Sequence, residues 1–286
     1  MWCLISLFAI LCQQLDSCKE HSYYQVSAPT TQSFGMSAFD TIEYTSIRWL
    51  GGAGFLINSR GTTVMIDPVL KGFDLPLLID MPIAPEEVTK LDAVLVTHCD
   101  NDHFSVKTCT ELSSVCREYH STKYVAGLMK EVGLKSFGHS IHEKFKIKTL
   151  DITTLYADHA WQNFYGEHSR EFKDDDFCGF WIETPDGIIW APGDTRYYDG
   201  LLNMPTQPNV IFFDFSDDPW HIGLDNAIKI ANKYPDAELL LSHWGTVDAP
   251  QMKAFNSNPK VLEGKIRNPG RIRILAAGEE FKLNIN

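Results

Sequence analysis

The stretch AVLVTHCDNDH, residues 93–103, constrains the fold most, because an apolar run ends directly in four metal-capable side chains. Continuous apolar runs of this kind are typical of strands buried on both faces of a sheet. His98, Asp100, Asp102 and His103 follow at the carboxyl end of the strand, where α/β folds present reactive groups. The stretch therefore predicts a covered sheet with a functional site at one edge.

The rest of the chain alternates strand-like and helical segments, which is typical of the α/β class. Strand patterns lie at 43–50, 55–68 with a turn at 59–61, 93–97, 122–127, 133–138, 147–157, 177–195 with a hairpin turn at 185–187, 209–215 and 237–246. Helical patterns lie at 84–92, around 105–119 and at 223–234. Because no internal repeat or low-complexity linker divides these segments, we expect one domain over residues 36–286.

The charge of the chain argues against one class of partner. Its 25 Lys and Arg stand against 37 Asp and Glu, which gives a formal net charge of -12. A surface this acidic repels phosphate backbones, so we expect a small-molecule substrate and no nucleic-acid partner. The sequence has no apolar run long enough for a bilayer-spanning helix, so we expect no transmembrane span. The oligomeric state stays open.

Residues 1–35 differ from the rest of the chain. MWCLISLFAILC at 1–12 has the length of a signal peptide, but no Lys or Arg precedes it and no small-residue cleavage site follows. Two predictions stay open. The segment is a leader, for secretion or for membrane anchoring through residues 1–18, or it is a dispensable extension on a cytoplasmic protein.

The cysteines beyond that segment do not suggest a disulfide framework. Cys99, Cys109, Cys116 and Cys178 lack CxxC spacing. We expect free thiols, as in a reducing compartment.

Histidines and carboxylates also follow other strand patterns. His159 follows ITTLYAD, Asp194 follows IIWAPG and His243 follows AELLLS. Imidazole nitrogen and carboxylate oxygen suit Zn²⁺, Mn²⁺ or Fe²⁺, whereas a thiolate site would use the cysteines. About three protein ligands per ion leave a position open for water, as a hydrolytic centre requires. A single histidine at a strand end is usually an ordinary surface residue, so the prediction depends on the recurrence.

The order of these motifs resembles the metallo-β-lactamase superfamily, whose usual text is HxHxDH, a distant His, an Asp in GDT and a final His. The resemblance runs from about residue 44 to 246, through WLGGAGFLI, VMIDP, VLVTHCDNDH, YADHAW, APGDTRYYDG and LSHWGT. The last two are especially similar to the branches of ascorbate-6-phosphate lactonases and of the phospholipase D acting on N-acylphosphatidylethanolamines. The resemblance implies a four-layer αβ/βα sandwich and a metal-dependent hydrolase.

The resemblance also implies roles for the motif residues. The expected ligands are His98 and His159 for a first ion, Asp102, His103 and His243 for a second, and Asp194 as the bridge, with a shared hydroxide as the nucleophile. Asp67 is expected beside a ligand histidine, although it could equally cap its own turn. Asp102 and His221 are the predicted catalytic residues. His221 is either the acid for the leaving group or an ordinary residue before a helix.

Two residues depart from the family pattern. Asp100 stands where the family has its second histidine, and Gly52 stands where related branches often have a histidine. If Asp100 is a ligand, it makes the cluster less positive and favours Mn²⁺, Mg²⁺ or Fe²⁺ relative to Zn²⁺. We expect two divalent ions, Zn²⁺ or Mn²⁺ first, with Fe²⁺ or Mg²⁺ as alternatives. A carboxylate also reaches less far than an imidazole, so a degenerate first site in a non-catalytic metal-binding or interaction protein is the rival hypothesis.

Residues near the motifs predict a substrate wall. It would consist of Trp161, Phe164, Tyr165 and His168 after the distant histidine, with Tyr197 and Tyr198 after GDT, although aromatic clusters are more often core. Arg196 is the one cation beside a ligand motif and is also placed at the substrate. The predicted substrate is therefore a lactone, an ester or a phosphodiester, and a nuclease is the weaker alternative.

Overall fold

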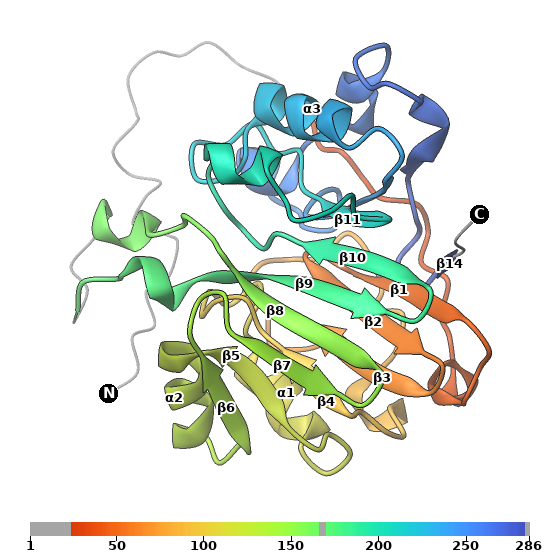
Figure 1. Cartoon of the computed structure of the whole chain (residues 1–286), viewed down its shortest axis with the longest axis vertical. Coiled ribbons are helices and arrows are strands. Elements are labelled where there is room, and N and C mark those ends of the chain that lie inside the picture. Colours follow the sequence, from red (N-terminus) through yellow and green to blue (C-terminus); the bar gives the residue numbers. More distant parts are fainter. Residues whose placement is uncertain (1–23, 166–169, 284–286) are drawn as a thin grey trace.

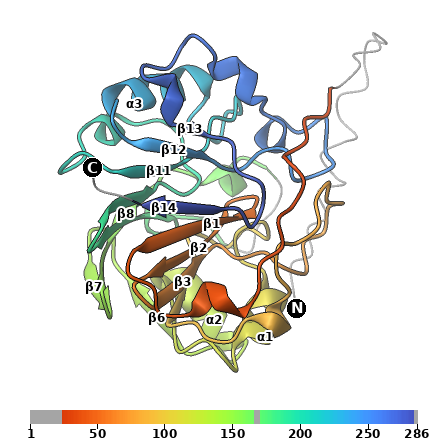
Figure 2. The same ribbon diagram turned by 90° about the vertical axis from the view of Figure 1, so that its right-hand side faces the viewer.

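The structure is a computed structural model that describes residues 24–165 and 170–283, and it consists of two sheets packed face to face (Figure 1). Helices α1 (Val106–Leu112) and α2 (Lys123–Glu131) cover the outer face of one sheet. Helix α3 (Leu224–Lys233) covers the outer face of the other sheet (Figure 2). The predicted four-layer αβ/βα sandwich is confirmed.

The first sheet has the strand order β14-β1-β2-β3-β4-β5-β6. Its strands are β1 (Thr45–Gly51), β2 (Gly54–Ser59), β3 (Thr62–Ile66), β4 (Ala93–Leu95), β5 (Tyr119–Thr122), β6 (Ser136–His139) and β14 (Glu280–Leu283). The strands from β14 to β3 pair antiparallel and those from β3 to β6 pair parallel. Arg60 and Gly61 join β2 to β3 with φ of 53° and 89°, the left-handed pair that a tight hairpin of this hand requires.

The second sheet has the strand order β13-β12-β11-β10-β9-β8-β7. Its strands are β7 (Lys144–Ile147), β8 (Leu150–Tyr156), β9 (Cys178–Thr184), β10 (Gly187–Ala191), β11 (Val210–Phe213), β12 (Glu238–Leu241) and β13 (Ile272–Arg273). Strands β7 to β10 pair antiparallel and β10 to β13 pair parallel. Each sheet thus has an antiparallel half and a parallel half.

Short 3₁₀ turns connect many of these elements. They are η2 (Met36–Phe39), η3 (Pro85–Glu87), η4 (Trp161–Asn163), η5 (Asp174–Asp176), η6 (Asp199–Leu202), η7 (Lys253–Phe255), η8 (Pro259–Leu262) and η9 (Pro269–Arg271). The larger core lies between the two sheets, where the rings of Phe55 and Phe212 stack at 3.6 Å between centroids. A smaller core, with Met65 and Leu112, lies beneath α1 and α2. The two sheets are therefore held together by buried apolar surface, which fixes the loops at their edge relative to each other.

The predicted strand at 122–127 is wrong. Those residues begin α2, and the side chain of Thr122 caps the helix by accepting a hydrogen bond from Val125 N. The strand in this region is β5, which ends at Thr122, where the prediction had it begin. Its polar side chains are buried because they find distant partners, such as the carbonyl of Val96 for the Ser121 hydroxyl at 2.6 Å.

Two predicted helices are shorter than expected. The helix at 84–92 is only the turn η3, because the backbone is extended from Val88 onward and Leu91 already forms a bridge with Cys116. The helix around 105–119 ends at Leu112. The chain must leave the helix there to reach β5, which lies between β4 and β6.

Residues 24–35 form a segment that runs along both halves of the sandwich. Val26 is buried in the larger core, Ala28 N donates to Gly245 O at 2.8 Å, and Gln32 N donates to Ala277 O at 2.8 Å. The part of the predicted leader at 1–23, including residues 1–18, lies outside the described residues. The domain boundary at residue 36 stays a prediction, and residues 24–35 contact the domain.

The structure shows no disulfide among the described residues. Cys99, Cys109, Cys116 and Cys178 are free, and burial raises the pKa of the Cys178 thiol well above its usual range. Among the described residues, no helix is long and apolar enough to cross a membrane.

Candidate metal centre

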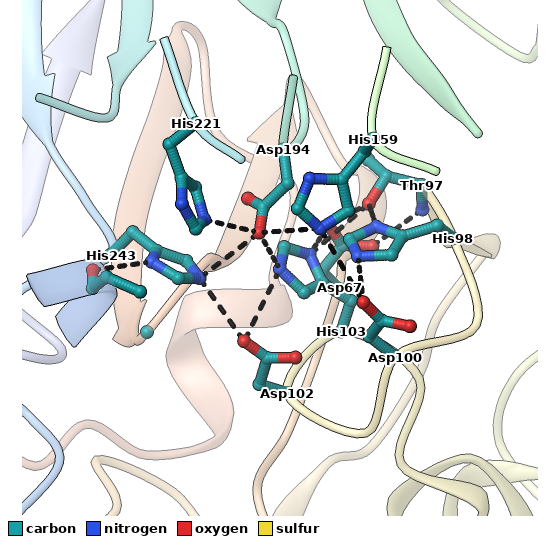
Figure 3. Close-up of polar contacts among 12 residues, drawn as sticks. Asp67, Thr97, His98, Asp100, Asp102, His103, His159, Asp194, His221 and His243 are labelled. Atoms are coloured by element: carbon teal, nitrogen blue, oxygen red, sulfur yellow. Dashed lines mark hydrogen bonds and ion pairs between the residues drawn. The ribbon is translucent and has the colours of Figure 1, made fainter. Parts of the chain in front are cut away.

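The predicted ligands meet at one edge of the sandwich, where loops from both sheets converge (Figure 3). The β4–α1 loop supplies four of them, and the others follow β8, β10 and β12. The seven residues are His98, Asp100, Asp102, His103, His159, Asp194 and His243. All but Asp100 and Asp102 are at most 5% exposed. The sandwich therefore brings together residues up to 145 positions apart in the chain (His98 to His243).

Each imidazole in this group is oriented by a partner on its Nδ1 atom. His103 donates to Asp67 Oδ2 at 2.8 Å, His159 to Trp220 O at 2.8 Å and His243 to Ala254 O at 3.0 Å. His98 Nδ1 lies 3.0 Å from Thr97 Oγ1, whose hydroxyl donates to Asp67. Because Nδ1 is the donor, the lone pair of each neutral ring is on Nε2, which faces the centre.

The Nε2 atoms of His98 and His103 are buried and make no hydrogen bond within the part of the chain that the structure describes. Each lies near a carboxylate, 3.3 Å from Asp100 for His98 and 3.1 Å from Asp194 for His103, and a divalent cation would satisfy the nitrogen and the carboxylate together. The donor set of imidazole nitrogens and carboxylate oxygens fits Zn²⁺, Mn²⁺ or Fe²⁺. The residues present thus fit a metal centre.

The donor atoms form two groups around one shared carboxylate. Asp102, His103, Asp194 and His243 make one group, and His98, Asp100 and His159 make the other, each with donor atoms within 4.8 Å of one another. Asp194 Oδ2 lies 3.1 Å from His103 Nε2 and 3.8 Å from His159 Nε2, so it contacts both groups. This is the arrangement expected for a carboxylate that bridges two ions.

Asp100 belongs to the group that also contains His98 and His159. Its Oδ2 atom is 3.3 Å from His98 Nε2 and 3.6 Å from His159 Nε2. Two donors hold the carboxylate there, Trp161 Nε1 on Oδ2 and Gln162 Nε2 on Oδ1, both at 2.7 Å. The shorter side chain therefore reaches the donor atoms of His98 and His159, and the three residues form a group that could hold an ion.

Asp67 lies beneath His103 and not over its own turn. It also accepts Thr97 N on Oδ1 at 2.7 Å and the Thr97 hydroxyl on Oδ2 at 2.7 Å. Asp67 and His243 have φ of 43° and 61°, left-handed values that are uncommon for residues other than glycine. Backbone strain of this kind gathers at functional sites, where the surroundings hold it.

Burial and neighbouring charges oppose each other in setting the pKa values at the centre. Burial raises the pKa of the Asp194 carboxyl, but the imidazoles of His103 and His243 outweigh burial and hold that pKa well below its usual range. Burial lowers the pKa of His103, but Asp194 and Asp102 outweigh it and raise that pKa well above its usual range. For His98 burial prevails and lowers the pKa. The buried carboxylates thus favour positive charge between them, from protons or from metal ions.

Comparison with known proteins supports this arrangement. A family model described as a β-lactamase superfamily domain matches residues 62–244, which is more than half of the chain. The chain belongs to the metallo-β-lactamase superfamily. The matched residues include all seven predicted ligands.

Relatives of this superfamily cover most of the chain. The chain is 24% identical over 252 residues to a UPF0173 metal-dependent hydrolase of Methanopyrus kandleri, covering 82% of this chain and 99% of the relative. It is 24% identical over 253 residues to one of Anaeromyxobacter, covering 82% and 85%. The predicted class, a metal-dependent hydrolase of this superfamily, is confirmed. The finer resemblance to the lactonase and phospholipase D branches stays a prediction.

Solved structures of other proteins share the fold. Igni18, a metallo hydrolase from the archaeon Ignicoccus hospitalis, has a TM-score of 0.67 at 16% identity and covers 85% of this chain and 99% of its own. An isothiocyanate hydrolase from Delia radicum gut bacteria has a TM-score of 0.65 at 18% identity and covers 83% and 99%. At these identities the likeness concerns the fold alone.

The other predicted residues lie around the centre at different distances. His221 joins it directly, with Nε2 3.0 Å from Asp194 Oδ2 and Nδ1 3.1 Å from Asp218 Oδ1. Trp161 contacts Asp100, as described. Tyr165 is 45% exposed, with its ring 5.8 Å from that of Trp220. His168 lies outside the described residues.

Arg196 and Tyr197 make their polar contacts with residues outside the predicted ligand set. Arg196 Nη2 donates to Asp158 Oδ1 at 2.7 Å, and its guanidinium lies 5.3 Å from the Trp220 ring. Tyr197 donates to Asp199 Oδ1 at 2.9 Å and accepts from Lys229 Nζ at 2.7 Å. Within residues 24–165 and 170–283, no hydrogen bond or ion pair joins either side chain to a predicted ligand, so their place at the substrate stays a prediction.

Three residues at the centre were not among the predicted site residues. Asp214 follows β11, can share a site with Asp194 and His221, and has a buried Oδ2 without a hydrogen-bond partner among the described residues. Gln162 holds Asp100, and the carbonyl of Trp220 holds His159. Asp214 ends the strand pattern NVIFFD, so its strand-end position was the available signal. A backbone carbonyl leaves no signal in a sequence.

Proposed function

We propose that the protein hydrolyses a lactone, an ester or a phosphodiester at a centre of two divalent ions. His98, Asp100 and His159 would hold one ion, Asp102, His103 and His243 the other, and Asp194 would bridge them. The bound pair supplies a hydroxide nucleophile at neutral pH and offsets the negative charge that develops on the attacked group. The single observation that carries this proposal is the convergence of the Nε2 atoms and carboxylates on Asp194 Oδ2.

The chain's own residues orient the reacting groups. Asp67 and Thr97 fix the ring planes of His103 and His98, which keeps both Nε2 lone pairs aimed inward. His221 is held from both sides by Asp218 and Asp194, and a protonated imidazole there can give its proton to the leaving group. The second ring nitrogen keeps its bond to Asp218 during this transfer, so His221 does not have to turn.

The metal preference and the partner class are part of this proposal. Carboxylates from Asp100, Asp102 and Asp194 bring three negative charges to the centre, and hard oxygen donors favour Mn²⁺ over Zn²⁺ more than an all-histidine first site does. The net charge of -12 supports a small molecule over a nucleic acid as the substrate.

The test combines metal content with turnover. The purified protein, reloaded with Mn²⁺ or Zn²⁺, should carry close to two ions per chain and hydrolyse at least one of a carboxylic ester, a lactone and a phosphodiester reporter. An isothiocyanate belongs in the panel because one similar structure is an isothiocyanate hydrolase. Asp194→Asn should lose turnover by at least about a hundredfold and lose bound metal, because the bridge between the two groups is weakened.

Asp199→Asn is the matched control, since Asp199 is exposed and contacts Tyr197 instead of the centre. It should retain both metal and turnover. Fewer than one ion per chain after reloading, or equal turnover in the Asp194→Asn and control variants, would refute the proposal.

A further inference from the structure

A pocket opens beside the second ligand group, at Asp102 and His243. It is open to solvent and is lined mainly by apolar side chains: Val69, Phe73, Leu77, Met81, Val247 and Phe255. The ring of Phe255 also stacks on the ring of His243, with 5.1 Å between centroids. The pocket wall and a metal-ligand candidate are therefore in direct contact.

Two of the loops that line the pocket, one after β3 and one after β12, are joined by backbone hydrogen bonds. Leu78 N donates to Thr246 O at 2.9 Å, Asp248 N donates to Pro76 O at 2.9 Å, and Leu77 bridges Val247. These contacts hold the two loops together at the pocket. An apolar pocket is typical of a small-molecule site.

Gly52 leaves the inner end of this pocket open. A Cβ atom added at Gly52 would meet nothing within 4 Å, whereas one at Gly51 would lie 2.9 Å from Ile79. Gly52 O accepts a hydrogen bond from His243 N at 2.8 Å, which places this open space next to the ligand loop. The absence of a side chain at Gly52 thus connects the pocket with the second metal group.

The pocket has no positive charge to bind a phosphate. Among the described residues, none of the lysines or arginines lines this pocket or the adjoining one at Asp194 and Asp214. Lys71, in the same loop region, is paired with Glu86 at 2.9 Å and Glu111 at 3.0 Å. An anionic group would therefore be desolvated here without a partner, whereas an alkyl group would gain from burial.

The pocket begins at two of the ligand candidates, Asp102 and His243. The ring of His221 lies 5.0 Å from that of His243, so the predicted acid and the pocket share this neighbour. The acyl chain is bonded directly to the attacked carbonyl carbon, whereas the leaving group is one oxygen atom further away. The substituent that enters a pocket beginning at these ligands is therefore the acyl chain, which would lie against Leu77 and Phe255.

We propose that this pocket binds the aliphatic acyl chain of an uncharged carboxylic ester or lactone, which makes the enzyme a carboxylic ester hydrolase selective for medium-length acyl groups. The assignment rests on the proposed hydrolase function and deepens it. In the reaction, the hydroxide adds to the carbonyl carbon and the bond between that carbon and the leaving oxygen breaks. The leaving oxygen takes the proton from His221 and becomes an alcohol, and the carboxylic acid that forms gives its proton back to His221 or to water, which leaves a carboxylate. With a lactone the carboxylate and the alcohol are on one product molecule.

The first test measures kcat/KM of the reloaded protein for nitrophenyl acetate, butyrate and hexanoate, with bis(nitrophenyl) phosphate for comparison. Burial of each added methylene should raise kcat/KM about fourfold. Leu77→Asp places a charge at the pocket wall and should reduce the hexanoate-to-acetate ratio at least tenfold. Ile274→Asp is the matched control, because Ile274 is an exposed aliphatic residue outside the pocket and its loss should leave the ratio unchanged.

The second test separates the pocket from the chemistry. Saturation-transfer NMR with 2-octanone, an uncharged molecule that cannot be hydrolysed, is measured on metal-stripped protein. Transfer should be strongest at the alkyl methyl group, weak in Leu77→Asp and unchanged in Ile274→Asp. If turnover fails for every reporter but this pattern holds, the hydrolase proposal falls and the pocket stands. Equal kcat/KM for acetate and hexanoate, faster phosphodiester turnover, or equal transfer in the two variants would overturn the acyl assignment.

Discussion

Asp67 shows how one residue at the strand end supports the centre without facing the substrate. It accepts hydrogen bonds from Thr97 N, the Thr97 hydroxyl and His103 Nδ1 while its own backbone is left-handed. A carboxylate in this position fixes the tautomer and plane of the histidine and increases the basicity of its Nε2 atom. The residue therefore acts on the metal through His103.

This predicts the effect of Asp67→Asn. Asparagine tolerates left-handed backbone, so the fold should be retained, but its amide gives His103 a weaker acceptor. We expect the affinity for Mn²⁺ or Zn²⁺ to fall about 10- to 100-fold, measured by titration against a competing chelator. Asp151→Asn, on an exposed part of β8, should leave the affinity unchanged. An Asp67→Asn protein that binds metal as tightly as the parent would contradict this role.

At the same scale, the residues that could be predicted are those whose side chains stand in a recognisable order. His98, Asp102, His103, His159, Asp194 and His243 each follow an apolar strand, so the sequence alone places them at one edge. Gln162 and Trp220 contribute one amide and one carbonyl from irregular loops, and they had no pattern to reveal them. The pairing of Trp161 with Asp100 depends on tertiary structure in the same way.

At the scale of elements, apolar strands were predictable and polar ones were not. The runs that became β4, β11 and β12 are apolar on both faces, as expected for central strands. Strand β5 is equally buried but reads YHST, and its polar groups bond to distant partners such as His139 Nε2 for His120 Nδ1, at 2.9 Å. Burial of polar residues depends on such partners, which a local pattern does not contain.

The segment 24–35 should stabilise the domain. It donates from Ala28 to the loop after β12 and from Phe34 to Pro82, so it spans the two loop regions that wall the apolar pocket. Deletion of residues 1–35 should lower the free energy of unfolding by about 2–4 kcal/mol, from the loss of buried Val26 and several hydrogen bonds. Chemical denaturation measures this loss.

Deletion of residues 1–23 is the control, because it leaves all of these contacts in place. Gly278→Ala tests the contact of this segment with the domain by a single substitution, since a Cβ at Gly278 would collide with the backbone of Gln32. It should destabilise the full chain more than the chain without residues 1–35, where only the left-handed backbone (φ 86°) and the contact with Pro82 still oppose the added methyl group. If deletion of residues 1–35 costs no more stability than deletion of residues 1–23, the segment does not support the domain.

At the scale of the whole molecule, the centre exists only when both sheets are folded and packed. The first sheet supplies His98, Asp100, Asp102 and His103, and the second supplies the remaining ligands. Because the unfolded chain cannot gather these groups, metal binding adds directly to the free energy of unfolding of the entire sandwich. The dependence of that stability on pH should therefore differ between metal-free and metal-loaded protein.

The sign follows from the imidazoles. In the metal-free protein, carboxylates overcome burial and raise the pKa of His103, His221 and His243 above the usual value of about 6.5. A raised pKa in the folded state stabilises fully below about pH 6.5, and that stability is lost as the pH rises through the folded pKa. The lowered pKa of His98 reduces the stability only below about pH 6.5, where the unfolded chain binds a proton that the folded protein does not. Metal-free protein should therefore lose stability above about pH 6.5.

Metal-loaded protein should show the opposite trend, because metal ions compete with protons for the same Nε2 atoms and bind more tightly as the pH rises. Thermal unfolding with EDTA and with excess Mn²⁺, from about pH 6.5 to two units higher, should give two Tm curves that move apart. In His103→Ala the separation should become smaller, since that variant removes one of the three raised pKa values and one ligand. Parallel Tm curves in the parent protein would mean that these imidazoles do not exchange protons for metal.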